Sequence, residues 1–114
     1  MKKNKSLISS IMSAKSARAE TFDAIGKMEE EAIAKLTNNV NEKILSAIKN
    51  GNFATTYFVY YSDYSDVKMT QRVYDTVIET FSSKGYKCEF IKDKEDYDVY
   101  SGKICIKWDL VEDK

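Results

Sequence analysis

The fold of this chain is decided by residues 17–50, which read ARAETFDAIGKMEEEAIAKLTNNVNEKILSAIKN. The stretch has one internal glycine, Gly26, and its apolar residues recur at steps of three and four, which places them on one stripe of an α-helix. The sequence therefore predicts one long helix that ends where Asn50-Gly51 allows a left-handed residue. The stripe consists of Phe22, Ile25, Met28, Ala32, Ile33, Leu36, Val40, Ile44 and Ile48.

The predicted helix is too long for the rest of the chain to cover. At about 1.5 Å per residue it would extend about 50 Å, whereas a body built from residues 52–114 would be only about 30 Å across. We therefore expect the chain to self-associate through helix 17–50 as a homo-oligomer, most simply a two-fold dimer. Residues 37–39 (Thr-Asn-Asn) have poor helix propensity. The alternative is therefore a helix that breaks there and folds back into a compact monomer.

The remainder of the chain is expected to form a small β-α-β-β body, residues 52–110. Residues 53–61 are rich in aromatic and β-branched residues, which is typical of a strand. Both faces of this strand are apolar, which favours a central strand or one covered by a partner chain. Residues 67–84 predict a helix, with Asp66 as its N-cap and Gly85 at its C-terminal end. The inner stripe of this helix consists of Val73, Tyr74, Val77, Ile78 and Phe81.

Two further strands are predicted at residues 86–92 and 103–108, joined by a charged loop over residues 93–101. They should form an antiparallel hairpin, and a right-handed crossover should make the first two strands parallel if they share a sheet. One helix then covers one sheet face, and the other face needs the long helix or another subunit. The predicted fold class is α+β, a single domain with a long N-terminal helix, preceded by a flexible basic arm at residues 1–16.

The charge and cysteine patterns bound the class of protein. Residues 1–19 hold five basic residues and no acid, which leaves 13 basic against 18 acidic residues in the rest of the chain. The N-terminus looks like a secretory signal, but serines interrupt its apolar residues, so we expect no secretion and no membrane partner. Cys88 and Cys105 alternate onto opposite faces of the predicted hairpin and should not form a disulfide. These features predict a reduced, cytoplasmic protein.

The sequence lacks the residues of most enzyme active sites. It contains no histidine, which removes the usual general base and the usual zinc ligand. Two cysteines 17 residues apart are not a zinc motif, and no glycine-rich phosphate loop is present. The acidic loop at residues 93–98 lacks the glycine and spacing of an EF-hand. We therefore expect no catalytic residues, no metal, no cofactor and no enzymatic activity.

Tyrosine is the one unusual feature of the composition. The chain has eight tyrosines, and four of them, Tyr57, Tyr60, Tyr61 and Tyr64, cluster at the end of the first predicted strand. Such a cluster suits either an interface or a ligand-stacking site, or else a partly buried strand end. Nucleic-acid binding is disfavoured, because the body is acidic and the chain has only two arginines.

Three short motifs carry a resemblance to a known group of proteins. They are Ile44-Leu45-Ser46-Ala47-Ile48-Lys49-Asn50-Gly51, Gly85-Tyr86-Lys87-Cys88 and Ile104-Cys105-Ile106-Lys107-Trp108, preceded by residues 17–21. Their order is similar to that in many small tailed-phage and prophage proteins of low-GC hosts. In this chain Cys88 stands where those proteins usually have valine, and the loop at residues 93–101 is long. The group offers no catalytic residues to transfer.

The resemblance implies a phage origin and a small homo-oligomeric protein. The expected function is non-catalytic binding in the host cytoplasm, to antagonise antiphage defence by binding a host protein or sequestering a signalling nucleotide. The alternative is a minor structural or assembly protein of the virion. A nucleotide would need cations against its phosphates. The candidate ligand-binding residues are therefore the two arginines with a neighbouring lysine and an aromatic partner: Lys15, Arg18, Tyr61 and Arg72.

Overall fold

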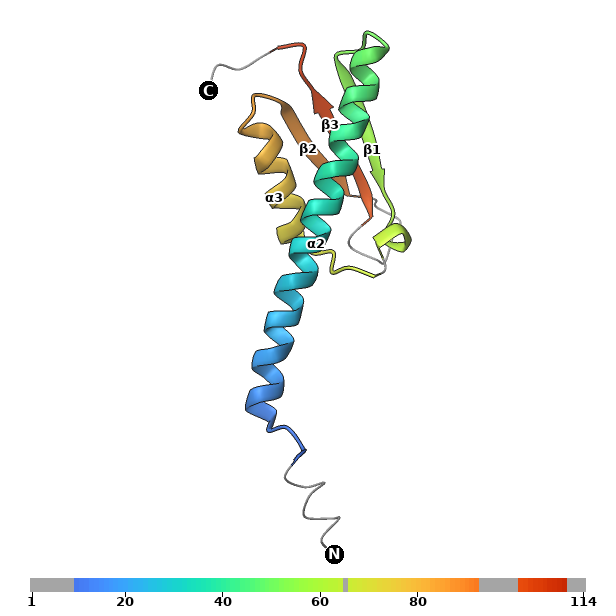
Figure 1. The fold of residues 1–114 in the computed structure, drawn as a ribbon. Helices are drawn as coiled ribbons and strands as arrows, with labels where there is room; N and C mark the ends of the chain where they lie inside the picture. Colours follow the sequence, from blue (N-terminus) through green and yellow to red (C-terminus); the bar gives the residue numbers. More distant parts are fainter. Residues whose placement is uncertain (1–9, 65, 93–100, 111–114) are drawn as a thin grey trace, which may run out of the picture.

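The computed structural model describes residues 10–64, 66–92 and 101–110, and over these ranges the chain has the predicted α+β fold (Figure 1). Most of the charged loop predicted at residues 93–101 lies outside the described residues. The elements in chain order are helix α2 (Ala14–Lys49), strand β1 (Ala54–Val59), the short 3-10 helix η1 (Tyr61–Tyr64), helix α3 (Gln71–Ser82), and strands β2 (Lys87–Lys92) and β3 (Gly102–Lys107).

Helix α2 is a single unbroken helix of 36 residues. It begins three residues earlier than predicted because Ser13 caps it, with the Ser13 hydroxyl accepting a hydrogen bond from the backbone N–H of Ser16 at 3.1 Å. It ends at Asn50, and Gly51 follows in a left-handed conformation with φ of 76°. The predicted alternative of a break at residues 37–39 is therefore wrong. Residues 14–16 belong to the helix and not to a flexible arm.

The three strands form one sheet in the order β1-β3-β2, and both neighbouring pairs are antiparallel. The predicted hairpin of β2 and β3 is thus confirmed, and β1 runs parallel to β2, although β3 lies between them. β1 is an edge strand, so the first of its two predicted alternatives, a central strand, is wrong, and the second, a strand covered by a partner chain, stays a prediction. The chain returns from β2 through the hairpin and inserts β3, whose Ile104 and Ile106 are fully buried, into the middle of the sheet.

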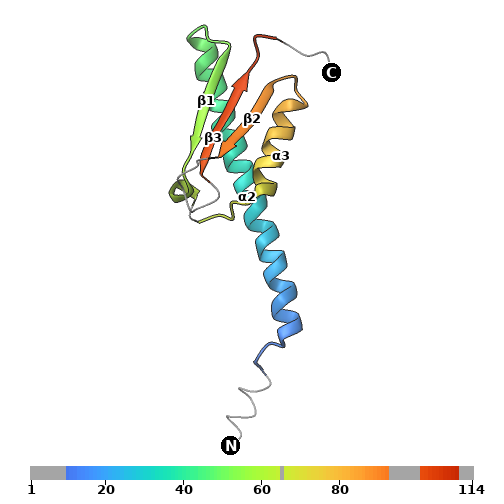
Figure 2. The ribbon, with the colours of Figure 1, turned by 180° about the vertical axis from the view of Figure 1, so that it is seen from behind.

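Both helices cover the same face of the sheet, and Figure 2 shows the strands uncovered on the other side. The inner face presents Tyr57, Val59, Ile104, Ile106, Cys88 and Phe90, because residues that pair across strands point to the same side. The long helix therefore joins α3 over one face and does not cover the second face. On the outer face, Phe58 and Ile91 lie in register on either side of Lys103, and they remain 56% and 42% exposed.

Helix α3 packs as its periodicity predicted, but it begins later. Four of the five predicted stripe residues are buried and Ile78 packs at the edge of the core. The helix starts at Gln71 because Thr70 is its N-cap: the Thr70 hydroxyl accepts from the backbone N–H of Val73. Asp66 is therefore not the cap. At the other end Gly85 adopts a positive φ of 96° that lets the chain reverse into β2.

Candidate functional site

The N-terminal part of α2 extends beyond the body and leaves part of its apolar stripe uncovered. Figure 1 shows this part of the helix projecting from the sheet and α3. Among the described residues 14–28 none is buried, and the first buried residue is Glu29. Phe22 is 59% exposed and Met28 is 37% exposed. About 22 Å of helix therefore carries no buried residue, and only Ile25 and Gly26 within it are half-buried.

The exposed apolar residues continue the stripe that packs into the core. Residues 18, 22, 25, 29, 32 and 36 follow one another at alternating steps of four and three, which is the spacing of one side of a coiled-coil helix. Ala32 and Leu36 on this stripe are fully buried under the body. Phe22 and Ile25 lie on the same side of the helix but beyond the body. Arg18 extends the stripe further, and its guanidinium lies 5.3 Å from the centre of the Phe22 ring.

Glu29 marks the point where the body begins. Its side chain accepts a hydrogen bond from the Thr70 hydroxyl at 3.0 Å and forms an ion pair with Arg72 at 3.0 Å. These partners sit at the start of α3, so one carboxylate ties the middle of α2 to that helix. The Glu29 side chain is 10% exposed, whereas that of Arg72 is 80% exposed. The Arg72 guanidinium is therefore open to solvent at the start of α3, and Glu29 partly neutralises its charge.

A second polar contact joins α2 to the tyrosine cluster. The Asn39 side-chain amide donates to the hydroxyls of Tyr57 and Tyr64 at 3.1 Å and 2.9 Å, and these two hydroxyls are 2.8 Å apart. Burial, and next the hydrogen bond with Tyr57, raise the pKa of Tyr64 well above its usual value. Two of the four clustered tyrosines thus belong to a buried network, whereas Tyr60 is 55% exposed.

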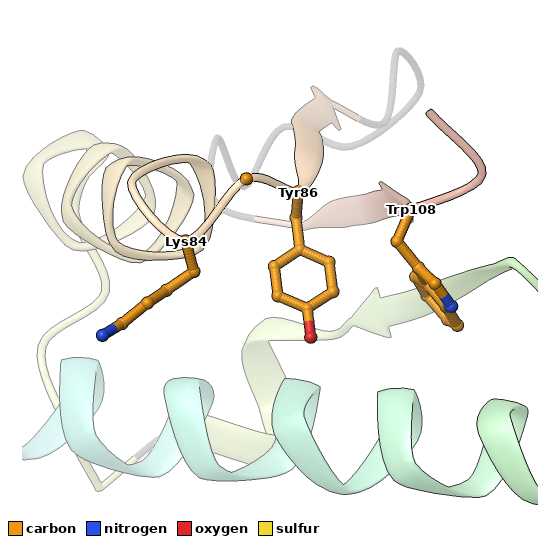
Figure 3. Close-up of a pocket in the computed structure, with 4 residues that line it drawn as sticks. Lys84, Tyr86 and Trp108 are labelled. Atoms are coloured by element: carbon orange, nitrogen blue, oxygen red, sulfur yellow. The ribbon is translucent and has the colours of Figure 1, made fainter. Parts of the chain in front are cut away.

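A small cleft lies between the end of α3, the start of β2 and the end of β3. It has a volume of about 230 Å³ and is lined by Lys84, Gly85, Tyr86 and Trp108. Figure 3 shows Lys84, Tyr86 and Trp108 extending their side chains toward the side on which α2 lies. The rings of Tyr86 and Trp108 meet edge to face with centroids 5.9 Å apart. The volume is below the range of about 300–1,000 Å³ that is usual for small-molecule sites.

The two cysteines are free and face opposite sides of the sheet, as their alternation predicted. Cys88 pairs in register with Ile106 on the inner face, and Cys105 pairs with Glu89 on the outer face. Burial, with smaller contributions from the nearby Cys105 and Glu89, raises the pKa of Cys88 to about 11. The Cys88 thiol is therefore protonated near neutral pH and is a poor nucleophile.

The structure does not bring the four predicted ligand-binding residues together in one pocket. Lys15 and Arg18 lie on the projecting part of α2, and Arg72 lies beside Glu29 at the start of α3. Glu29 follows Lys15 by fourteen positions on the same helix, which is about 21 Å along the axis. Tyr61 opens η1, beyond the end of β1.

The aromatic cleft and the Glu29 contact were not predicted from the sequence. Lys84, Gly85 and Tyr86 are consecutive, but Trp108 is distant in the chain, and only the register of β2 with β3 places it near Tyr86. One feature of the sequence could have indicated the Glu29 contact: Glu29 is a charged residue on the otherwise apolar stripe of residues 22–36. A carboxylate at such a position needs a partner.

The comparisons with known proteins add no family to this description. No family model matches the chain, and neither a curated protein nor a solved structure matches it. Within the described ranges, no group of three or more histidine, cysteine or acidic side chains is placed to hold a metal ion. The helices described here are also too short or too polar to cross a membrane.

Proposed function

We propose that the protein is a non-catalytic homo-oligomeric binding protein, most simply a dimer, in which the projecting part of α2 joins the copies. The observation that carries the proposal is the exposure of Phe22, 59% open to solvent, on the same stripe whose residues Ala32 and Leu36 are fully buried. A large apolar side chain left in water forgoes on the order of 1.5–3 kcal/mol of burial free energy. A second copy that carries the same stripe would recover part of that free energy.

The length of the projecting segment supports the same proposal. Isolated helices shorter than about 12–15 residues are marginal in water, because few hydrogen bonds offset the cost of nucleation. None of residues 14–28 is buried, and this segment of 15 residues is no longer than such marginal helices. Packing against another helix would stabilise the segment, since most helix stability in proteins comes from tertiary contacts.

The setting of this binding activity is proposed from the resemblance to small tailed-phage proteins. We propose that the oligomer acts in the host cytoplasm and antagonises antiphage defence by binding a host protein. A protein partner is favoured over a signalling nucleotide for two reasons. The cations Lys15, Arg18 and Arg72 are spread over the molecule, and the aromatic cleft of about 230 Å³ is small for a nucleotide. If mass spectrometry found the protein at fixed copy number in purified particles of a phage that encodes it, the virion alternative would replace this proposal.

Light scattering coupled to size exclusion tests the oligomer. The wild type is expected at about twice 13.1 kDa, and the double variant Phe22→Asp with Ile25→Asp is expected at the monomer mass. Both residues lie outside the core, so residues 29–49 should stay helical in the variant. Its circular dichroism spectrum should therefore keep most of the helical signal.

Leu45→Asp provides a matched control on the same helix. Leu45 is 51% exposed, similar to Phe22, but it lies on the side of α2 opposite the stripe. The control variant is expected to retain the wild-type mass. A wild-type mass near 13.1 kDa at micromolar concentration would refute the proposed oligomer.

A further inference from the structure

We propose that the second copy packs against the projecting part of α2 in the antiparallel direction, so that the two bodies lie at opposite ends of the dimer. This inference rests on the proposed homo-oligomer and names its orientation. The paired segment is residues 14–28 of each chain, centred near residue 21, and it is about 22 Å long.

The position of the body on α2 provides the first argument. The sheet and α3 lie on the side of α2 that carries Ala32, Leu36 and Val40, and Phe22 and Ile25 continue this same side. In a parallel pair joined through Phe22, both bodies would have to fit between the two helices. Figures 1 and 2 show that this side of α2 is filled by the chain's own body from the middle of the helix onward. An antiparallel partner occupies only the uncovered end.

The charges along the segment provide the second, independent argument. The exposed start of α2 carries Lys15 and Arg18 and no acid before Glu20. Three consecutive glutamates follow the uncovered segment, but Glu29 is paired with Arg72 of its own chain and Glu31 lies on the side of α2 opposite Phe22, so Glu30 is the carboxylate that can face a partner. A parallel pair would place each of these exposed charges beside its own copy, and like charges repel. An antiparallel pair brings the basic start of one helix toward Glu30 of the other, which is the complementary arrangement.

The apolar residues fall in the middle of this arrangement. In the antiparallel overlap, the partner residues on the stripe side that are level with Phe22 are Arg18, Ala19 and Phe22 itself. The small Ala19 beside the phenylalanines allows close approach of the helices. The carbon stem of Arg18, which already lies over its own Phe22 ring, adds apolar surface to the contact. The interface therefore has an apolar centre with charged groups at both ends.

Distances between paired spin labels test the orientation directly. Single cysteines are placed at Glu31 or Lys43 in a background with Cys88→Ala and Cys105→Ser, and each label is exposed on α2. In the antiparallel dimer the distance between two copies of a label grows by about 3 Å per residue away from the centre. The Lys43 distance is therefore expected to exceed the Glu31 distance by about 36 Å. A dimer in which the gain is under about half of that would overturn the orientation alone, whereas a monomer mass would overturn the oligomer as well.

Charge exchange gives a second test that keeps the native cysteines. Lys15→Glu with Arg18→Glu is expected to weaken an antiparallel dimer, raising its Kd about tenfold, by placing acids near Glu30. Adding Glu30→Lys to the same chain should return the Kd to within about threefold of wild type. In a parallel dimer Lys15 and Arg18 would face the same residues of the other copy. Replacing both by glutamate would then exchange a repulsion between cations for a repulsion between acids, and the dimer would not weaken. That result, or the absence of rescue, would contradict the antiparallel arrangement.

Discussion

Asn39 connects the middle of the long helix to the polar centre of the body. Its amide donates to two tyrosine hydroxyls, Tyr57 at 3.1 Å and Tyr64 at 2.9 Å, and Tyr64 is 1% exposed. Lys35, one turn earlier on α2, places its ammonium 5.0 Å from the centre of the Tyr64 ring. These contacts hold η1 against the helix. An asparagine with poor helix propensity is tolerated here because its side chain is bonded to the body.

Replacing Asn39 tests this network. Asn39→Ala is expected to lower the free energy of unfolding by about 1–3 kcal/mol, because the two hydroxyls lose their shared donor. Asn38→Ala is the matched control: Asn38 is adjacent and exposed, so its substitution should leave stability unchanged or slightly raised. Urea unfolding followed by circular dichroism measures both variants. Equal stability of the two would show that the network contributes little.

At the scale of the elements, periodicity predicted what a local pattern can encode. The apolar stripe of α3 and the alternating apolar residues of β3 were each visible in the sequence. The structure buries four of the five stripe residues, together with Ile104 and Ile106 of β3. The start of α3 was mispredicted because Asp66 and Thr70 are both capping residues, and Val67 and Met69 extended the apolar pattern upstream. Those two residues are buried in a segment that precedes the helix.

Strand order could not be predicted from the same patterns. The apolar residues on both faces of β1 suggested either a central strand or one covered by a partner chain, and β1 is an edge strand with Phe58 exposed. Which strand becomes central depends on where the hairpin returns, and that is a long-range property. The choice of candidate binding residues met the same limit, because residue type and adjacency could not show that Lys15 and Arg18 lie on the projecting part of α2 whereas Arg72 lies at the start of α3.

A pair of glycines tests the packing of the elements. A Cβ on Gly102 would meet the backbone carbonyl of Ile91 and would lie 2.7 Å from the Phe90 ring. Gly102→Ala is therefore expected to reduce the free energy of unfolding by about 1–3 kcal/mol, the usual cost of overpacking. A Cβ on Gly26 meets nothing within 4 Å, so Gly26→Ala should keep or raise stability by up to about 1 kcal/mol through helix propensity. Thermal unfolding of both variants measures these changes. If Gly102→Ala left the free energy of unfolding unchanged, the described contact of β3 with β2 would be contradicted.

At the scale of the whole molecule, the chain is a compact body attached to one end of a helix that it covers only in part. The sequence predicted the overhang from the length of the helix compared with the expected diameter of the body. It could not predict that the covered part begins at Glu29, because this boundary depends on contacts with Thr70 and Arg72, about 40 residues away. The central claim is that a second copy covers the remaining helix and keeps it folded.

Amide hydrogen exchange in wild type and in Phe22→Asp with Ile25→Asp tests this claim most directly. Peptides from residues 16–28 are expected to be protected in the wild type and to exchange rapidly in the double variant. Peptides from residues 32–47, which the body covers, should be protected in both proteins. Exchange of residues 16–28 at the same rate in the two proteins, whether fast or slow, would contradict the account.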